Sequence, residues 1–118
     1  MRESFGVDLS YDREGVKWVD GFVERMRSQL PPEKHTNVSI PLAEFVGECI
    51  VQTYGGTWKQ RDKIWGVHIK EDVWVCPGAK VAKQFANGHS DSVLSFFECI
   101  PILWDQHPGS FRDNNDRR

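Results

Sequence analysis

Two glutamates, Glu44 and Glu48, have the spacing in this sequence that most nearly suggests chemistry. They lie four residues apart in a segment of helical periodicity, so their carboxylates would sit side by side on one helix. Paired carboxylates can transfer protons or hold a metal ion. At this spacing they are more often solvated on the polar face of a helix, which is our interpretation for Glu44. Glu48, between Gly47 and Cys49, is the one that we expect to be buried.

Histidines and cysteines give weaker signals. The run His89-Ser90-Asp91 contains the residue types of a catalytic triad, but adjacent residues cannot form triad geometry, and turn or capping chemistry explains the run better. Cys49 and Cys76 fall at predicted core positions, where cysteine acts as a small hydrophobic residue. Together with Cys99 they contain no CxxC pair, so neither a disulfide framework nor a zinc site is predicted. We expect no metal and no cofactor.

The composition predicts an ordinary soluble protein of one domain. The chain has 118 residues and a formal net charge of -2, and 27% of its residues are charged with both signs interspersed. We assign residues 1–104 to a single domain and residues 105–118 to a polar tail that we expect to be mobile. The lack of a basic excess argues against a nucleic-acid module. No apolar run could span a membrane or act as a signal region, which predicts a cytoplasmic protein.

Apolar residues recurring at three- and four-residue steps predict two helices in the first half of the chain, over residues 11–29 and 41–54. Pro41 suits the first turn of the second helix, and Gly55-Gly56 suits its end because glycine readily adopts a left-handed conformation. Gly47 lowers the helix propensity of this segment by roughly 1 kcal/mol relative to Ala. Close packing against another element would explain its presence.

Two further helices are predicted after the central segment of the chain. The first is a short helix after Pro77-Gly78 that stops at Asn87-Gly88, and the second covers residues 90–100. Ser90 is the expected N-cap of the second, as Ser10 is of the helix over 11–29. Pro101 predicts that the last helix ends or kinks near residues 98–100.

Between the helices, residues 57–76 alternate apolar and polar side chains, which predicts a three-stranded antiparallel meander. Two-residue turns at Asp62-Lys63 and Glu71-Asp72 would set its register. The core face of the sheet would then carry Trp58, Trp65, Val67, Ile69, Trp74 and Cys76. The open face would carry Lys59, Arg61, Ile64, Gly66, His68, Lys70, Val73 and Val75. The predicted fold class is α+β in the order α-α-β-β-β-α-α, with the helices covering the Trp face.

Several phrases of the chain resemble a family of small bacterial domains of unknown function. The first is a helix start at Leu9 to Asp12, and the second is a Gly-Glu pair at Gly47-Glu48. The third is a Gly-Gly-x-Trp strand start at Gly55 to Trp58. The fourth is a Lys-Val-x-Lys…Asn-Gly segment, formed by Pro77, Lys80-Val81, Lys83 and Asn87-Gly88. The resemblance covers residues 8–100. It implies the fold described above and a bacterial origin, and it implies no activity.

Without a chemical constellation, the sequence favours a non-catalytic protein-interaction domain of the immunity or adaptor type. Its predicted binding surface is the open sheet face, with Lys59, Arg61, His68, Lys70, Val73 and Val75, which mixes cationic and apolar groups. The expected partner is an acidic protein, with a symmetric homodimer as an alternative. Two other functions stay open: a small metal- or acid/base-dependent enzyme using Glu48 with His68 or His89, and an RNA-contacting accessory domain using the basic face.

Overall fold

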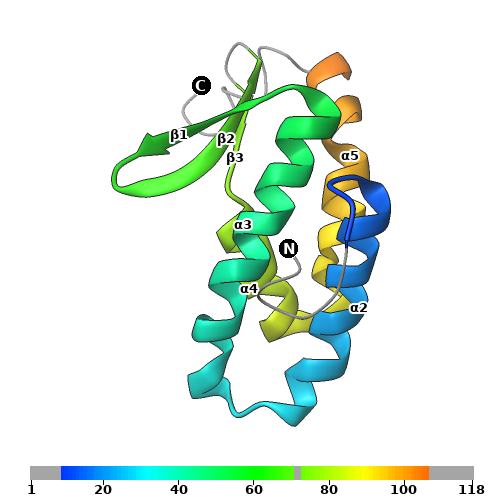
Figure 1. The fold of residues 1–118 in the computed structure, drawn as a ribbon, viewed down its shortest axis with the longest axis vertical. Coiled ribbons are helices and arrows are strands. Elements are labelled where there is room, and N and C mark those ends of the chain that lie inside the picture. The colour runs from blue at the N-terminus through cyan, green and yellow to red at the C-terminus, as the bar shows by residue number, and fades with distance from the viewer. Residues whose placement is uncertain (1–8, 71–72, 107–118) are drawn as a thin grey trace.

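The computed structural model describes residues 9–70 and 73–106, with the elements in the predicted order (Figure 1). The helices of this part are α2 (Arg13–Gln29), α3 (His35–Tyr54), α4 (Pro77–Asn87) and α5 (Val93–Gln106). The strands are β1 (Thr57–Arg61), β2 (Ile64–Lys70) and β3 (Val73–Val75), in the order β1-β2-β3. Short 3-10 turns cover Pro32–Lys34 and Gly88–Asp91. The α+β class and the antiparallel meander are confirmed.

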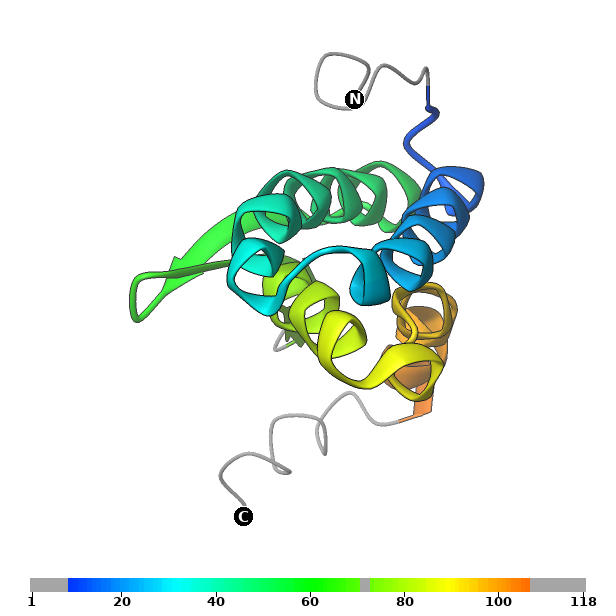
Figure 2. The ribbon, with the colours of Figure 1, turned by 90° about the horizontal axis from the view of Figure 1, so that it is seen from below.

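The four helices surround one core, and the sheet lies beside α3 with the β1–β2 hairpin projecting away from the helices (Figures 1 and 2). Every one of these helices, as well as β2 and β3, contributes fully buried or nearly buried apolar side chains. Representative members are Val19, Ile50, Val67, Val81 and Phe97. The amphipathic stripes predicted from the sequence therefore meet in a single interior.

Helix α2 begins at Arg13, and its N-cap is Asp12 rather than the predicted Ser10. The Asp12 carboxylate accepts the backbone N–H groups of Glu14 at 3.0 Å and Gly15 at 3.3 Å. The Ser10 hydroxyl donates to the same carboxylate at 2.7 Å. Ser10 therefore orients the cap, and an ionised carboxylate is the better acceptor for the positive end of the helix.

Helix α3 begins six residues before the predicted start at Pro41, which therefore lies inside the helix. Tertiary contacts hold the added turns in place. The His35 ring stacks on Phe85 with centroids 4.7 Å apart, and its Nε2 lies 3.0 Å from the Leu30 carbonyl oxygen. The prediction over 41–54 was wrong at its start because proline disfavours a helix interior only locally, and packing outweighed that preference.

The last helix is capped by Ser92, not by the predicted Ser90. The Ser92 hydroxyl accepts the backbone N–H of Ser95 at 3.2 Å, which is the usual geometry of an N-cap. The Ser90 hydroxyl instead donates to the Asn87 carbonyl in the 3-10 turn. Gly88 ends α4 with a φ of 77°, as the sequence predicts.

Pro101 does not end α5, which continues to Gln106. A proline at this position leaves the carbonyl of Phe97, four residues earlier, without its helical donor. The Tyr54 hydroxyl donates to that carbonyl at 2.9 Å, and the Tyr54 ring packs on Phe97 with centroids 5.0 Å apart. Of the two alternatives predicted near residues 98–100, an end or a kink, the end was wrong, because a side chain from α3 satisfies the freed carbonyl.

The β1–β2 hairpin has the predicted turn and register. Asp62 and Lys63 adopt φ values of 51° and 68°, as a two-residue hairpin turn of the right twist requires. Trp58 lies opposite Val67, and Gln60 lies opposite Trp65. The side-chain alternation of β1 and β2 is therefore as predicted.

The β2–β3 register differs from the prediction by one residue. Val73 lies opposite Lys70 as expected next to the turn, but a bulge between His68 and Lys70 then places Trp74 opposite His68. An extra residue in one strand exchanges the faces of all residues beyond it. Trp74 therefore lies on the His68 face rather than on the core face.

The bulge buries two valines that we had placed on the open sheet face. Val73 is 1% exposed and Val75 is 6% exposed, and both belong to the core. Cys76, predicted on the core face, is only half-buried and precedes α4. Two β-branched residues thus replace Trp74 and Cys76 in the core, where they pack well on a pleated surface.

Sheet and helices meet closely where Trp58 of β1 packs on Gly47 of α3. A methyl group at Gly47 would overlap the Trp58 indole ring, so the glycine leaves the space that the ring fills. This contact confirms the close packing that Gly47 suggests.

We expect Gly47→Ala to lower the free energy of unfolding by about 1–3 kcal/mol, because the clash with Trp58 outweighs the better helix propensity of alanine. Gly21→Ala in α2 is the matched control. Its added methyl group would come no closer than 3.4 Å to Arg25, at the end of a flexible side chain. We expect the control to be neutral or up to about 1 kcal/mol more stable. Urea denaturation measures both, and equal effects would contradict the packing role of Gly47.

Candidate functional site

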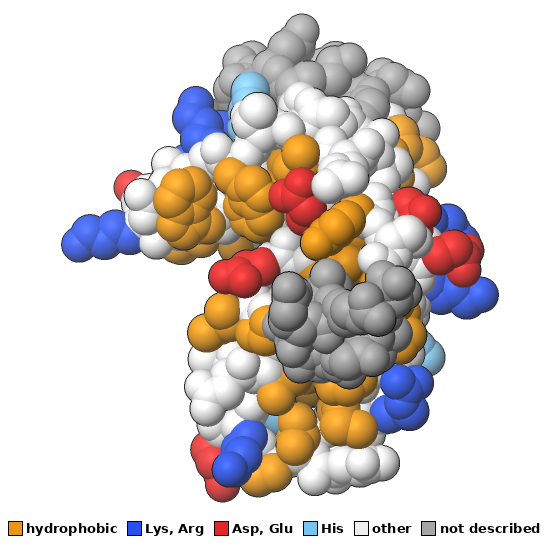
Figure 3. Space-filling model, viewed as in Figure 1, with side chains coloured by type: hydrophobic (Ala, Val, Ile, Leu, Met, Phe, Trp, Pro, Cys, Tyr) orange, Lys and Arg blue, Asp and Glu red, His pale blue; other side chains and the backbone are white. Residues whose placement is uncertain are grey.

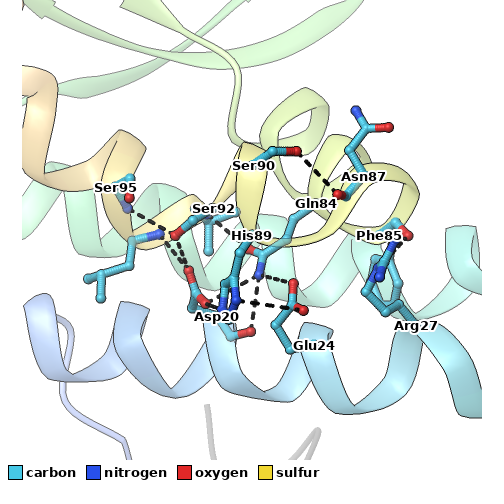
Figure 4. A network of polar contacts seen from close by, with 12 residues as sticks. Asp20, Glu24, Arg27, Gln84, Phe85, Asn87, His89, Ser90, Ser92 and Ser95 are labelled. Atoms are coloured by element: carbon cyan, nitrogen blue, oxygen red, sulfur yellow. Dashed lines mark hydrogen bonds and ion pairs between the residues drawn. The ribbon is translucent and has the colours of Figure 1, made fainter.

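A buried carboxylate, Asp20 of α2, is the centre of the most extensive polar network among the described residues (Figure 4). Asp20 is only 6% exposed to solvent. Its Oδ2 accepts the Ser92 hydroxyl and, at 3.1 Å, the backbone N–H of Leu94. Its Oδ1 lies 3.2 Å from both Gln84 Nε2 and His89 Nε2. Asp20 therefore joins α2 to the start of α5.

Gln84 of α4 completes the network and is fully buried. Its Nε2 donates to Glu24 at 2.9 Å and to the Asp20 carbonyl at 3.2 Å. Its Oε1 accepts the Val93 backbone N–H at 2.9 Å. Two orphan N–H groups of the first turn of α5 are thus satisfied by side chains from other helices.

The network contains Ser, His and Asp but lacks the geometry of a catalytic triad. The carboxylate of Asp20 lies between Ser92 and His89, so the imidazole does not take the serine proton. Burial raises the pKa of Asp20, but hydrogen bonds from Ser92, Leu94 and Gln84 together with the nearby His89 outweigh it and hold that pKa below its usual value. These contacts indicate a structural link between helices.

The sequence held a signal for this network that we did not use. Asp20 lies on the apolar stripe of α2 between Val16 and Val23, and Gln84 lies three residues after Val81 on the apolar face of α4. A polar residue within an apolar stripe predicts a buried polar group that needs partners.

We expect Asp20→Asn to lower the free energy of unfolding by about 1–3 kcal/mol at pH 7, because a neutral amide is a weaker acceptor for Ser92 and Leu94. The folded-state pKa of Asp20 is depressed, so its stabilisation is present above its usual pKa of 3.8 and is lost as the pH falls through the folded value. The gap between wild type and variant should therefore close in acid.

Denaturation at a series of pH values measures this gap, with Asp62→Asn in the exposed hairpin turn as the matched control. A gap that stays constant from neutral pH into acid would contradict the role of the Asp20 charge.

The residues of the enzyme hypothesis do not come together. Glu48 accepts the Trp58 indole N–H at 3.3 Å and the Gln52 amide at 3.0 Å. His68 lies on the other face of the sheet from Trp58, because Val67 is the partner of Trp58. His89 instead contacts Asp20 of α2, whereas Glu48 belongs to α3. Within residues 9–70 and 73–106, no three His, Cys, Asp or Glu side chains are grouped to hold a metal ion.

The predicted basic surface exists only in part. Lys59, Arg61 and His68 share the open sheet face, and the half-buried Trp74 takes the place predicted for the valines. Trp74 donates its indole N–H to the Lys59 carbonyl at 3.0 Å, and the Arg61 guanidinium lies 5.1 Å from its ring. The side chain of Lys70 lies outside the described residues. Val73 and Val75 were wrongly assigned to this surface because the bulge turns them into the core.

A groove on the opposite side of the sheet was missed by the sequence analysis. It has a volume of about 330 Å³ and lies between the hairpin, the first half of α3 and the start of α4. We call it the Trp groove. The residues that line it are Ser39, Ile40, Ala43, Glu44, Trp58, Trp65, Pro77 and Gly78. Figure 3 shows hydrophobic side chains over the hairpin next to acidic side chains at its junction with the helices.

Trp65 is the prominent exposed residue of this groove. It is 57% exposed, whereas we had predicted that it would be buried together with Trp58 and Trp74. It does share a face with Trp58, but the hairpin projects beyond the helices, so nothing among the described residues covers its tip (Figure 1). Ile64 and Ile40 nearby are 52% and 54% exposed.

The three cysteines are unpaired, as predicted. Cys49 is fully buried, and burial raises the pKa of its thiol to about 12. Cys76 is half-buried and Cys99 is exposed. The three thiols therefore differ widely in access to solvent.

We expect a thiol reagent at pH 8 to modify Cys99 first and to leave Cys49 unreacted in the folded protein, because a buried thiol of raised pKa supplies almost no thiolate. Unfolding in denaturant without reductant should release three reactive thiols per chain. Mass spectrometry of labelled fragments identifies each site, and rapid native labelling of Cys49 would contradict its burial.

No family model, no curated protein and no solved structure matches this chain. Over the described residues, the helices are too short or too polar for any of them to cross a membrane.

Proposed function

We propose that the protein is a non-catalytic protein-interaction domain, of the immunity or adaptor type, and that the Trp groove is where it binds its partner. The exposure of Trp65 at 57% beside a formed groove carries this proposal. Large aromatic side chains exposed at the rim of a concave surface are typical of binding sites, and tryptophan is enriched among the residues that dominate binding energy.

The fold supports this proposal by holding the groove ready. Trp58 is fixed by packing on Gly47 and by its hydrogen bond to Glu48, so the inner wall of the groove has a defined position. The turn at Asp62-Lys63 sets the position of Trp65 on the hairpin. A wall that needs no ordering on association loses less conformational entropy when a partner binds.

The basic sheet face is the weaker candidate for the same function. Its aromatic residue, Trp74, is half-buried, hydrogen-bonded to Lys59 and covered by Arg61. Within the described residues, the Trp65 ring makes no aromatic stacking or cation–π contact of this kind. Covering Trp65 would therefore remove more apolar surface from water than covering Trp74.

The proposal places the domain in the cytoplasm, with another protein as its partner. Three unpaired cysteines suit a reducing compartment, where disulfides are rare. A protein partner fits the absence of a basic excess over the whole chain.

Selection from a random-peptide display library tests the proposal. We expect peptides that bind the wild type to lose at least about tenfold in affinity for Trp65→Ala, because an aromatic anchor commonly contributes 2 kcal/mol or more. The free energy of unfolding of this variant should change by no more than about 1 kcal/mol, since the ring is largely exposed.

The control is the double variant Lys59→Glu and Arg61→Glu on the other sheet face, which should retain binding. If the affinity of the peptides is unchanged by Trp65→Ala but falls in the double variant, the binding site is the basic face instead. A library that yields no peptide for the wild type would count against the interaction function.

A further inference from the structure

We infer that the Trp groove, taken as the binding site of the proposed function, accepts a lysine or arginine side chain of the partner protein. The first observation is the charge of its lining. Glu44 is the one charged residue among the eight described residues that line the groove, and no Lys or Arg is among them. A partner group that enters it therefore meets a negative field.

Glu44 is placed to receive a cation. It is exposed, and it makes no hydrogen bond or ion pair with any residue in the described ranges. Glu48 lies one helical turn further along α3, where its two oxygens already accept the Trp58 indole and the Gln52 amide. Glu48 thus orients the aromatic wall, and Glu44 keeps its acceptor capacity for a ligand.

The aromatic walls favour the same ligand class. Trp58 and Trp65 both line the space beside Glu44. Tryptophan offers the most attractive ring face for a cation, and the attraction grows when the cation is partly desolvated. The other face of this sheet shows the same pairing within the chain, since the Arg61 guanidinium lies 5.1 Å from the Trp74 ring.

The remaining lining selects against the other side-chain classes. Ile40, Ala43 and Pro77 offer an apolar surface that suits the aliphatic stem of a lysine or arginine. A purely apolar side chain would cover Glu44 without pairing its charge, which is unfavourable. An acidic side chain would be repelled by the same carboxylate. A side chain with a long aliphatic stem and a cationic head suits both the apolar lining and the carboxylate of Glu44.

Three matched peptide libraries test this inference. Each is an acetylated, amidated heptapeptide with random flanks and one fixed central residue, which is lysine, norleucine or glutamate. We expect the lysine library to yield binders that lose about tenfold or more in affinity when the lysine is replaced by norleucine, because the cationic head is lost and the stem is kept. Fluorescence titration of the wild-type protein measures the affinities.

Substitution of the carboxylate provides the second arm. Glu44→Gln should weaken binding of the lysine peptides several-fold and reduce its dependence on salt, and Glu44→Lys should abolish it. Glu33→Gln is the matched control, since Glu33 is an exposed carboxylate in the 3-10 turn before α3 and lines no part of the groove. Its peptide affinity should equal that of the wild type.

The outcomes separate this inference from the proposed function. Peptides that depend on Trp65 but bind equally well with norleucine would overturn the cationic ligand and leave the interaction function in place. The absence of any Trp65-dependent peptide would count against both. Sedimentation of the same samples adds a third outcome, because Trp65-dependent self-association without peptide binding would identify a second copy of the chain as the occupant and overturn the inference.

Discussion

The packing of Trp58 on Gly47 is the contact on which the arrangement of sheet and helices depends. The indole ring occupies the space that a side chain at Gly47 would fill, and its N–H group reaches Glu48 one residue further along α3. A short three-stranded sheet is marginal without an apolar face packed on another element. This contact therefore sets where β1 lies and, with it, the inner wall of the Trp groove.

The two faces of the sheet then acquire opposite character. Lys59 and Arg61 point to the face that carries Trp74, where Arg61 lies over the indole ring. The face of Trp58 and Trp65 borders the carboxylate of Glu44. Alternation along β1 places Lys59 and Arg61 on one face and Trp58 on the other. The negative charge beside the Trp face comes from Glu44 of α3.

In this protein several polar residues of types common in active sites have structural roles, and several large apolar residues are exposed. Asp20, Gln84 and His89 include residues common in active sites, yet their hydrogen bonds go to helix ends and to one another. Trp65 and Ile64, which would normally lie in a core, stand exposed on the hairpin. A buried polar group needs partners to be tolerated, whereas an exposed apolar group gains stability when a partner covers it. The contacts of each group, more than its type, therefore indicate its role.

The fold class, the order of the elements, the β1–β2 register and the ends of α3 and α4 at Gly55 and Gly88 could all be predicted from the sequence. These depend on periodicity and on local backbone conformation, which neighbouring residues control. Tertiary structure alone decided the bulge that buries Val73 and Val75, the continuation of α5 past Pro101 by way of Tyr54, and the meeting of Glu44 with Trp65. Each of these joins residues distant in sequence, whose contacts form only when the helices and the sheet pack together.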